Sequence, residues 1–204
     1  MHKAFLVLGQ QMGLQNMRNI LPNEIDVFIN AAIVDEVRKA ILTNVNTAFG
    51  DKVTIQRNTI SPINFIRTLY TSKSINVETN KIIADDTDIM YYTSIWVSYE
   101  NNDDIYQCRL IEPDELANTL RDYCNGASFD YPIATLINED PTGYVWTIYS
   151  GIKKPNKAVI NFIRNPNKVD YENNISCDLP KYTHNQIVEA AIAKYFTSVG
   201  STTN

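Results

Sequence analysis

The hydrophobic pattern of this chain changes its period twice, and this change limits the folds that the chain can adopt. Apolar residues recur at helical spacing over residues 25–41, alternate in several short runs between residues 90 and 164, and return to helical spacing over residues 187–196. A period of 3.6 residues is typical of an amphipathic helix, and a period of two is typical of a half-buried strand. The sequence therefore predicts an α+β fold, in which a helical unit of two N-terminal helices and a C-terminal helix carries an inserted antiparallel β-meander lobe.

The expected organisation is a single chain unit, 1–204, with one inserted lobe. A chain of 204 residues can form one core, or one core with an appended lobe. Neither an internal repeat nor a Gly/Ser-rich linker divides the sequence. We therefore expect residues 1–84 and 169–204 to form the helical unit and residues 85–168 to form the β-rich lobe.

Residues 177–196 give the clearest helix signal. Thr183 is followed three residues later by Gln186, which is the pattern of a capping box, and Pro180 precedes both. A single helix of this length is marginal in water, so its apolar face must pack on another element. We expect that element to be the face of residues 25–41. The predicted core of the closing helix is Ile187, Val188, Ala191, Ile192 and Tyr195.

Four other helices are expected, over residues 3–20, 23–46, 63–70 and 113–124. Asn23 is the predicted N-cap of the second helix, because its side chain can accept a first-turn N–H. The expected inward positions are Phe5, Leu8 and Met12, then Ile25, Phe28, Ile29, Ala32, Ile33, Val37, Ala40 and Ile41, then Ile63, Ile66, Leu69 and Tyr70, and finally Leu116, Leu120 and Tyr123. The expected water-facing residues of the second helix are Asp35, Glu36, Arg38 and Lys39, and the expected end of the fourth helix is Asn125-Gly126.

The strands are short and follow one another closely. Because short turns join most of them, consecutive strands are expected to pair as antiparallel neighbours. The predicted strands are residues 51–57, 90–99, 105–111, 133–137, 144–149 and 158–164.

The residues indicate no catalytic centre, no cofactor site and no metal site. A nucleophile–base pair needs a histidine, and the chain has only His2 and His184. His184 begins the closing helix and is interpreted as a surface residue rather than a ligand or base. The acidic run 85–88 lacks the glycine and the distal glutamate of a calcium loop, so a solvated turn is favoured.

Charge and cysteine content limit the compartment and the partners. The formal charge of −5 argues against binding of nucleic acid through a basic surface. Lys153 and Lys154 form a small basic group that is interpreted as a solvated hairpin end. The N-terminal apolar run is too short for a signal peptide or a membrane span, which favours the cytoplasm. Three reduced thiols are therefore expected, at Cys108, Cys124 and Cys177.

Five phrases carry a resemblance to a known family. In order, they are LPNEIDVFINAAIVDEVRKAIL, CRLIEPDELANTL, DYPIATL, VINFIRNPNKV and CDLPKYTHNQIVEAAIAKYF. They resemble virion structural proteins from phages of gut Bacteroidetes, including crAss-like phages, in which small proteins stack as rings below the portal. The architecture is also similar to that of head-to-tail adaptors of short-tailed phages. The matching positions are Asn30 and Ala31, then Ile163, Arg164, Pro166 and Lys168, and then Leu179, Pro180, His184, Ile187 and Val188.

The resemblance implies a non-enzymatic head-to-tail connector at the portal vertex of a virion. Its partners would be itself in a ring of twelve copies, the portal protein, and further ring or tail proteins, with genomic DNA passing nearby and no membrane. We hypothesise that the β lobe makes the lateral contacts, with sheet edges that can pair across subunits, and that the helical unit faces the portal. Two alternatives stay open: another virion part, such as a tail-completion or capsid-bound protein, and a small enzyme or binding module unrelated to virions.

Overall fold

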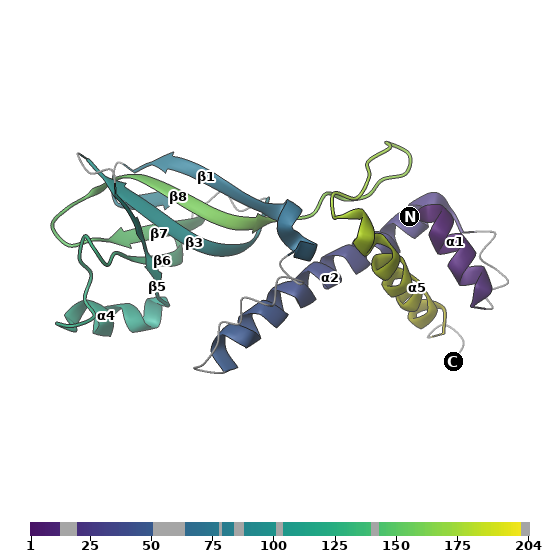
Figure 1. Ribbon diagram of the computed structural model, residues 1–204, viewed down its shortest axis with the longest axis horizontal. Coiled ribbons are helices and arrows are strands. Elements are labelled where there is room, and N and C mark those ends of the chain that lie inside the picture. The colour runs from purple at the N-terminus through teal and green to yellow at the C-terminus, as the bar shows by residue number, and fades with distance from the viewer. Residues whose placement is uncertain are drawn as a thin grey trace. The chain divides into compact units, whose positions relative to one another are not determined.

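A computed structural model describes residues 1–12, 20–50, 64–77, 79–83, 88–100, 104–139 and 143–200, with the backbone alone at 43–50 and 199–200. The chain divides into two compact units: a helical unit, Met1–Leu69 with Asn165–Asn204, and a β unit, Tyr70–Arg164. The α+β fold with an inserted β lobe is therefore confirmed (Figure 1). The β unit begins at Tyr70 rather than at residue 85, and the helical unit resumes at Asn165 rather than at residue 169.

Among the described residues, three long helices build the helical unit. They are α1 (His2–Gln11), α2 (Pro22–Gly50) and α5 (His184–Gly200), with 3-10 turns η2 (Arg67–Leu69) and η4 (Lys181–Thr183). α5 packs against α2 and α1, so the predicted docking of the closing helix on the second helix is confirmed. The fully buried side chains of the three helices include Phe5, Ile25, Ile29, Ile33, Val37, Ile187, Val188, Ala191 and Ile192. Tyr195 is half-buried and meets the Phe28 ring edge-on.

Both predicted helix caps are wrong. α2 begins at Pro22, and the Glu24 carboxylate accepts the Leu21 N–H at 3.1 Å, so Leu21 rather than Asn23 holds the cap position. Ahead of α5, the Thr183 hydroxyl donates to the Pro180 carbonyl, and Gln186 donates to a side chain of α2. The Gln186 side chain therefore reaches across to α2 rather than back to its own helix start.

Three other helix expectations need correction. α1 ends at Gln11, and Met12 is exposed instead of inward; residues 13–19 lie outside the described residues. The helix expected over 63–70 is one turn at 64–66 followed by η2, and Tyr70 already belongs to a strand. Ile63, the first position expected in that helix, lies outside the described residues, as does the strand expected over 51–57.

The β unit contains two four-stranded sheets instead of one meander. One sheet has the order β1-β8-β3-β4, and the other has the order β2-β7-β6-β5. Most neighbours are antiparallel, but β5 and β6 are parallel, and β7 and β8 lie in different sheets although they are consecutive. The elements are β1 (Tyr70–Asn76), β2 (Lys81–Ile83), β3 (Ile89–Tyr99), β4 (Ile105–Gln107), β5 (Arg109–Leu110), α4 (Pro113–Arg121), β6 (Ile133–Glu139), β7 (Gly143–Tyr149) and β8 (Pro155–Arg164).

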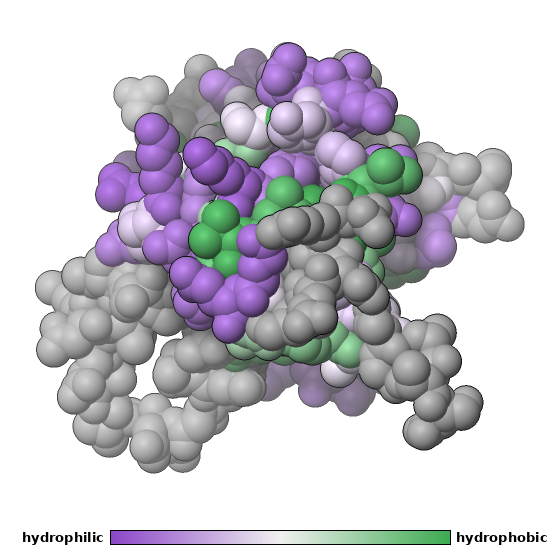
Figure 2. All heavy atoms as spheres, turned by 90° about the vertical axis from the view of Figure 1, so that its right-hand side faces the viewer, coloured by the Kyte–Doolittle hydropathy of each residue, from purple (hydrophilic) through white to green (hydrophobic). Residues whose placement is uncertain are grey.

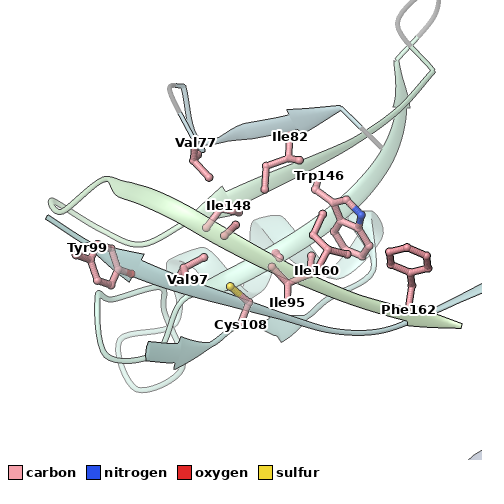
Figure 3. Close-up of a cluster of buried hydrophobic side chains, with 12 residues drawn as sticks. Val77, Ile82, Ile95, Val97, Tyr99, Cys108, Trp146, Ile148, Ile160 and Phe162 are labelled. Carbon is pink, nitrogen blue, oxygen red and sulfur yellow. The ribbon is translucent and has the colours of Figure 1, made fainter. Parts of the chain in front are cut away.

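The two sheets share one hydrophobic core (Figure 3). The Tyr92 ring meets the Trp146 indole edge-on at 5.0 Å and links β3 of one sheet to β7 of the other. Side chains from both sheets thus cover one another, which is the packing of a β sandwich. The core residues are Val77, Ile82, Ile95, Val97, Tyr99, Cys108, Ala134, Trp146, Ile148, Ala158, Ile160 and Phe162.

Cys108 is the point where the chain passes from one sheet to the other. Its N–H donates to the Ile95 carbonyl in the first sheet at 2.8 Å, and the Arg109 N–H donates to the Pro132 carbonyl at 2.8 Å. The strand predicted over 105–111 is therefore two short strands, β4 and β5. The alternating pattern does not reveal that the chain changes sheets here, because Cys108 stays buried in the core that both sheets share.

Candidate interaction surfaces

The described residues contain no cluster with the make-up of a metal centre. No three His, Cys, Asp or Glu side chains among them lie close enough together to hold an ion. His184 is half-buried, and its Nε2 lies 3.2 Å from the Leu179 carbonyl oxygen. Its imidazole thus supports the turn ahead of α5. The other candidate sites are surfaces that could bind another protein.

The segment 165–180, here called the linker segment, is attached to α2 by Asn30. The Asn30 amide donates to the Val169 carbonyl at 2.9 Å, and its carbonyl oxygen accepts the Val169 N–H at 2.7 Å. One side chain thus satisfies both backbone groups of a buried residue, as a neighbouring strand would do. Asn30, which carries the family resemblance, therefore fixes the path of the linker segment across α2.

A groove lies where the linker segment crosses α2. It has a volume of about 390 Å³, and its lining is mostly apolar. We call it the α2–linker groove, and it is lined by Asn30, Ala31, Ile33, Val34, Asp35, Pro166, Asn167 and Lys168. Four of the positions that carry the resemblance therefore meet at one surface: Asn30 and Ala31 from α2, and Pro166 and Lys168 from the linker segment.

A buried carboxylate fixes the same segment further along. Asp26 accepts the Tyr171 N–H at 3.0 Å, and its other oxygen lies 2.7 Å from His2 Nε2. The rings of His2 and Tyr171 lie 4.9 Å apart. Three parts of the chain thus meet at one acidic side chain: the start of α1, the first turns of α2, and the linker segment.

A second buried carboxylate joins α2 to α5. Glu36 was expected to face water, but its side chain is 8% exposed. The Gln186 amide and the Lys39 ammonium each donate to it at 2.6 Å. Asp35, one position earlier, accepts a hydrogen bond from Lys194 on α5, which lowers the pKa of Asp35 below its usual range. The helix pair is therefore fixed by polar contacts beside its apolar core.

The Leu-Pro phrase forms a compact turn at the start of α5. Leu179 is buried, and its carbonyl oxygen is the partner of His184. The Pro180 carbonyl accepts both the Thr183 N–H and the Thr183 hydroxyl, at 3.0 and 2.7 Å. These contacts give hydrogen-bond partners to two successive backbone carbonyl groups ahead of the helix. The Leu-Pro phrase therefore fixes where α5 begins. Arg164, which belongs to the VINFIRNPNKV phrase, is the last residue of β8 in the β unit.

A second apolar groove lies between α2 and α5. Its volume is about 390 Å³, and it is lined by Ile20, Glu24, Val27, Phe28 and Tyr195. We call it the α2–α5 groove. Val27 is 64% exposed although it is apolar, and Glu24 is the single charged side chain of the lining.

Other exposed apolar residues of the helical unit are more scattered. In Figure 2, which looks onto this unit from the side of α1, a small hydrophobic group lies among mainly hydrophilic side chains. Val7 and Met12 are the exposed apolar residues at α1. Single exposed apolar side chains are normal on protein surfaces, so they do not by themselves mark a site.

At one end of the β unit, two loops expose large apolar side chains. We call this surface the tip, and it consists of residues 122–131, between α4 and β6, and residues 150–154, between β7 and β8. Tyr123 and Ile152 are fully exposed, and Tyr131 is mostly exposed. The prediction that Tyr123 faces inward is therefore wrong, and α4 itself buries no residue.

The first loop of the tip is held by its own hydrogen bonds. α4 ends at Arg121, and the Asp122 carboxylate accepts the N–H groups of Cys124 and Asn125 at 2.8 and 3.3 Å. The side-chain amide of Asn125 donates to the same carboxylate at 2.7 Å, and these bonds lower the pKa of Asp122. The predicted helix end at Asn125-Gly126 is therefore wrong, because an aspartate turn ends the helix first.

The second loop of the tip packs against the first. Gly151 has a φ of +69°, and a Cβ placed on it would lie 3.5 Å from the Ala127 carbonyl oxygen. The Lys153 ammonium lies 4.3 Å from the centre of the Phe129 ring, which in turn packs against the aromatic ring of Tyr99. The two loops therefore form one continuous surface.

The three thiols occupy different environments and are all free. Burial raises the pKa of Cys108 to about 12, and burial also raises the pKa of Cys177. Cys124 lies exposed on the tip. The cysteine with the most accessible thiol is therefore part of the tip.

Neither a known protein family nor a curated protein matches this sequence. Within the described ranges, none of the helices has the length and apolar character needed to cross a lipid bilayer.

Sequence reasoning identified some residues of these surfaces and missed others. The phrases pointed to Asn30, Ala31, Pro166 and Lys168, although periodicity alone gave them no role. The tip was missed because Tyr123 was read as part of a longer amphipathic helix. The signal that could have revealed it is the composition of residues 122–131, in which five of ten residues are Tyr, Asn, Gly or Ser, the types enriched in the binding loops of antibodies.

Proposed function

We propose that this protein is a non-enzymatic structural component of a phage virion, forming a ring at the portal vertex that connects the head to the tail around the DNA channel. The observation that carries the proposal is the α2–linker groove. Two phrases of the family resemblance are far apart in sequence, yet Asn30 and Ala31 share this groove with Pro166 and Lys168. Their meeting at one accessible surface supports a shared binding role for them.

The proposed partners follow from the ring. Twelve copies would match the portal, with the helical unit facing the portal and the β unit contacting neighbouring copies and further ring or tail proteins. The formal charge of −5 suits a channel that DNA passes without being bound, because phosphate groups are not attracted to a negative surface. Assembly would take place in the host cytoplasm, and the mature location would be the virion.

The test uses the portal protein encoded in the same genome. Both proteins are co-expressed, purified through a tag on the portal, and examined by negative-stain imaging and light scattering. The expected result is a ring of this protein, with the symmetry of the portal, attached to it. Absence of any portal complex, together with a strict monomer in isolation, would refute the proposal.

A matched pair of variants tests the groove itself. Ala31→Arg places a long charged side chain in the α2–linker groove, and Ala117→Arg makes the same change on α4, outside it. Both alanines are exposed on helices, so neither change should unfold its unit. We expect Ala31→Arg to abolish portal capture and Ala117→Arg to leave it unchanged. Equal capture by both variants would show that the groove is not the portal-binding surface.

A further inference from the structure

The tip exposes apolar side chains on a frame that is already ordered. Tyr123 and Ile152 are fully exposed, yet the loops that carry them are fixed by the Asp122 turn and by the Lys153–Phe129 contact. An exposed apolar side chain on a flexible loop can be incidental. On a rigid frame it is prepared for binding, because little conformational entropy is lost when a partner covers it.

The second loop of the tip carries positive charge directly beside Ile152, whereas the two carboxylates of the tip, Asp122 and Asp130, lie in the first loop. Lys153 and Lys154 follow Ile152 directly, and both are exposed. A partner of this surface should therefore offer an apolar depression with an acidic group at its border.

The same chain carries such a depression. The α2–α5 groove is lined by the apolar side chains of Ile20, Val27, Phe28 and Tyr195, and Glu24 is its charged residue. Its volume of about 390 Å³ is sufficient to admit one or two large side chains. The groove and the second loop of the tip thus share apolar character, and the lysine pair beside Ile152 is opposite in charge to Glu24.

We propose that the tip of one copy binds in the α2–α5 groove of a second copy. The choice of a second copy as the partner rests on the proposed ring function, and the contact names the surfaces through which the ring would form. Ile152 inserts into the groove, Tyr123 covers its border, and the lysine pair faces Glu24. Because the two surfaces are different, the contact is head-to-tail, and repetition of it gives a closed ring or an open filament.

The first test is disulfide trapping with the native thiol of the tip. Val27→Cys introduces a thiol into the groove, and Leu42→Cys introduces one on the same helix outside it. The two parent side chains are 64% and 60% exposed, so the new thiols should be similarly accessible. Under mild oxidation, we expect Val27→Cys to give a ladder of disulfide-linked oligomers through Cys124 and Leu42→Cys to stay monomeric. Adding Cys124→Ser should abolish the ladder. Equal cross-linking of both variants, or none in either, would overturn the proposal.

The second test uses complementation. Ile152→Asp destroys the tip and keeps the groove, whereas Val27→Asp destroys the groove and keeps the tip. Each variant alone should associate with itself about 10- to 100-fold more weakly than the parent, since one large apolar side chain is no longer buried in the contact. A mixture of the two should form dimers and nothing larger, because each pair has one intact contact. No dimer in the mixture would overturn the proposal.

The outcomes also separate this inference from the proposed function. If the parent forms closed rings and both Asp variants still form them, the inference is wrong and the ring function stands. If the parent forms only open chains that both variants abolish, the inference stands and the ring function falls. If Ile152→Asp loses portal capture but keeps self-association, the tip binds portal instead, and the inference is overturned.

Discussion

Replacing Asn30 with alanine tests the most specific contact of the helical unit. Asn30→Ala removes both hydrogen bonds to Val169, which is 6% exposed. A hydrogen bond contributes about 1 kcal/mol net, and a buried polar group left without a partner costs about 1–3 kcal/mol. Two such groups are left, but Asn30 itself lines the α2–linker groove, so water entering the groove can partly replace the amide. We therefore expect the free energy of unfolding to fall by about 2–4 kcal/mol.

The measurement is urea unfolding followed by circular dichroism at a helix-sensitive wavelength, because the contact lies in the helical unit. Asn118→Ala on α4 is the matched control, since Asn118 is exposed, and a change of less than about 0.5 kcal/mol is expected for it. Asn30→Asp is informative as well. It keeps the acceptor for the Val169 N–H but turns an oxygen toward the Val169 carbonyl, so it should also destabilise the protein. An Asn30→Ala variant as stable as its parent would refute this reasoning.

Three further predictions concern the core, the charges and the thiols. Ile192→Asp should destabilise the fold by about 3 kcal/mol or more, since it buries an unpaired charge, while Ala193→Asp on the exposed face should leave the melting temperature nearly unchanged. The pKa of Asp35 is lowered, chiefly by its hydrogen bond from Lys194. Its ionised form therefore stabilises the fold fully above the ordinary carboxyl pKa of about 3.9, and this stabilisation is lost as the pH falls through the lower folded value. Asp35→Asn should thus reduce the loss of stability on acidification below about pH 4, measured by urea unfolding at several pH values; an unchanged slope would contradict the contact. Iodoacetamide at pH 8 should label Cys124 rapidly and Cys108 only after unfolding, as mass spectrometry of timed samples would show; rapid labelling of Cys108 would contradict its burial.

The helices with one apolar face were predictable from the sequence because burial on a single side gives a helical period. α2 and α5 meet this condition, and both lie where the pattern placed them. Their caps were not predictable, because local rules compete with tertiary partners. Gln186 could have capped α5 locally, but the charge-assisted bond to Glu36 is the one it makes. The same contact explains why Glu36, read as a water-facing residue, is buried.

Strands were predictable only where one face is buried. β3, β7 and β8 contribute side chains to the shared core and showed the alternating pattern. β1 has the sequence YTSKSIN and is almost entirely exposed, so it has no alternating apolar pattern. β5 has two residues, too few for any pattern. This is why the β unit begins before the expected boundary, and why one predicted meander is two sheets.

The two candidate surfaces could not be predicted from hydrophobic periodicity. The α2–linker groove joins two phrases that are distant in sequence, and spacing within either phrase contains no sign of the other. The tip depends on the aspartate turn at Asp122, which ends α4 before Tyr123 and turns that ring to solvent. The groove therefore arises from contacts between distant segments, and the tip arises from loop conformation. The spacing of hydrophobic residues predicts neither of these.

The sheet edges argue for contact through the tip in preference to strand addition. β4 has three residues, β2 three and β5 two, so each offers a short edge. The longer edge strand β1 places Lys73 opposite the buried Ile160, on the core-facing side of the sheet. A lysine at that position opposes pairing with another sheet, since the added strand would cover its charge. The open half of β3 is interrupted by register shifts between Ile89 and Tyr91 and between Tyr92 and Ser94, which distort the edge further. Pairing of sheet edges across subunits, one hypothesis from the sequence, is therefore disfavoured by the strands themselves. If the β unit makes lateral contacts, the side chains of the tip are better suited to them than the backbone of any described strand.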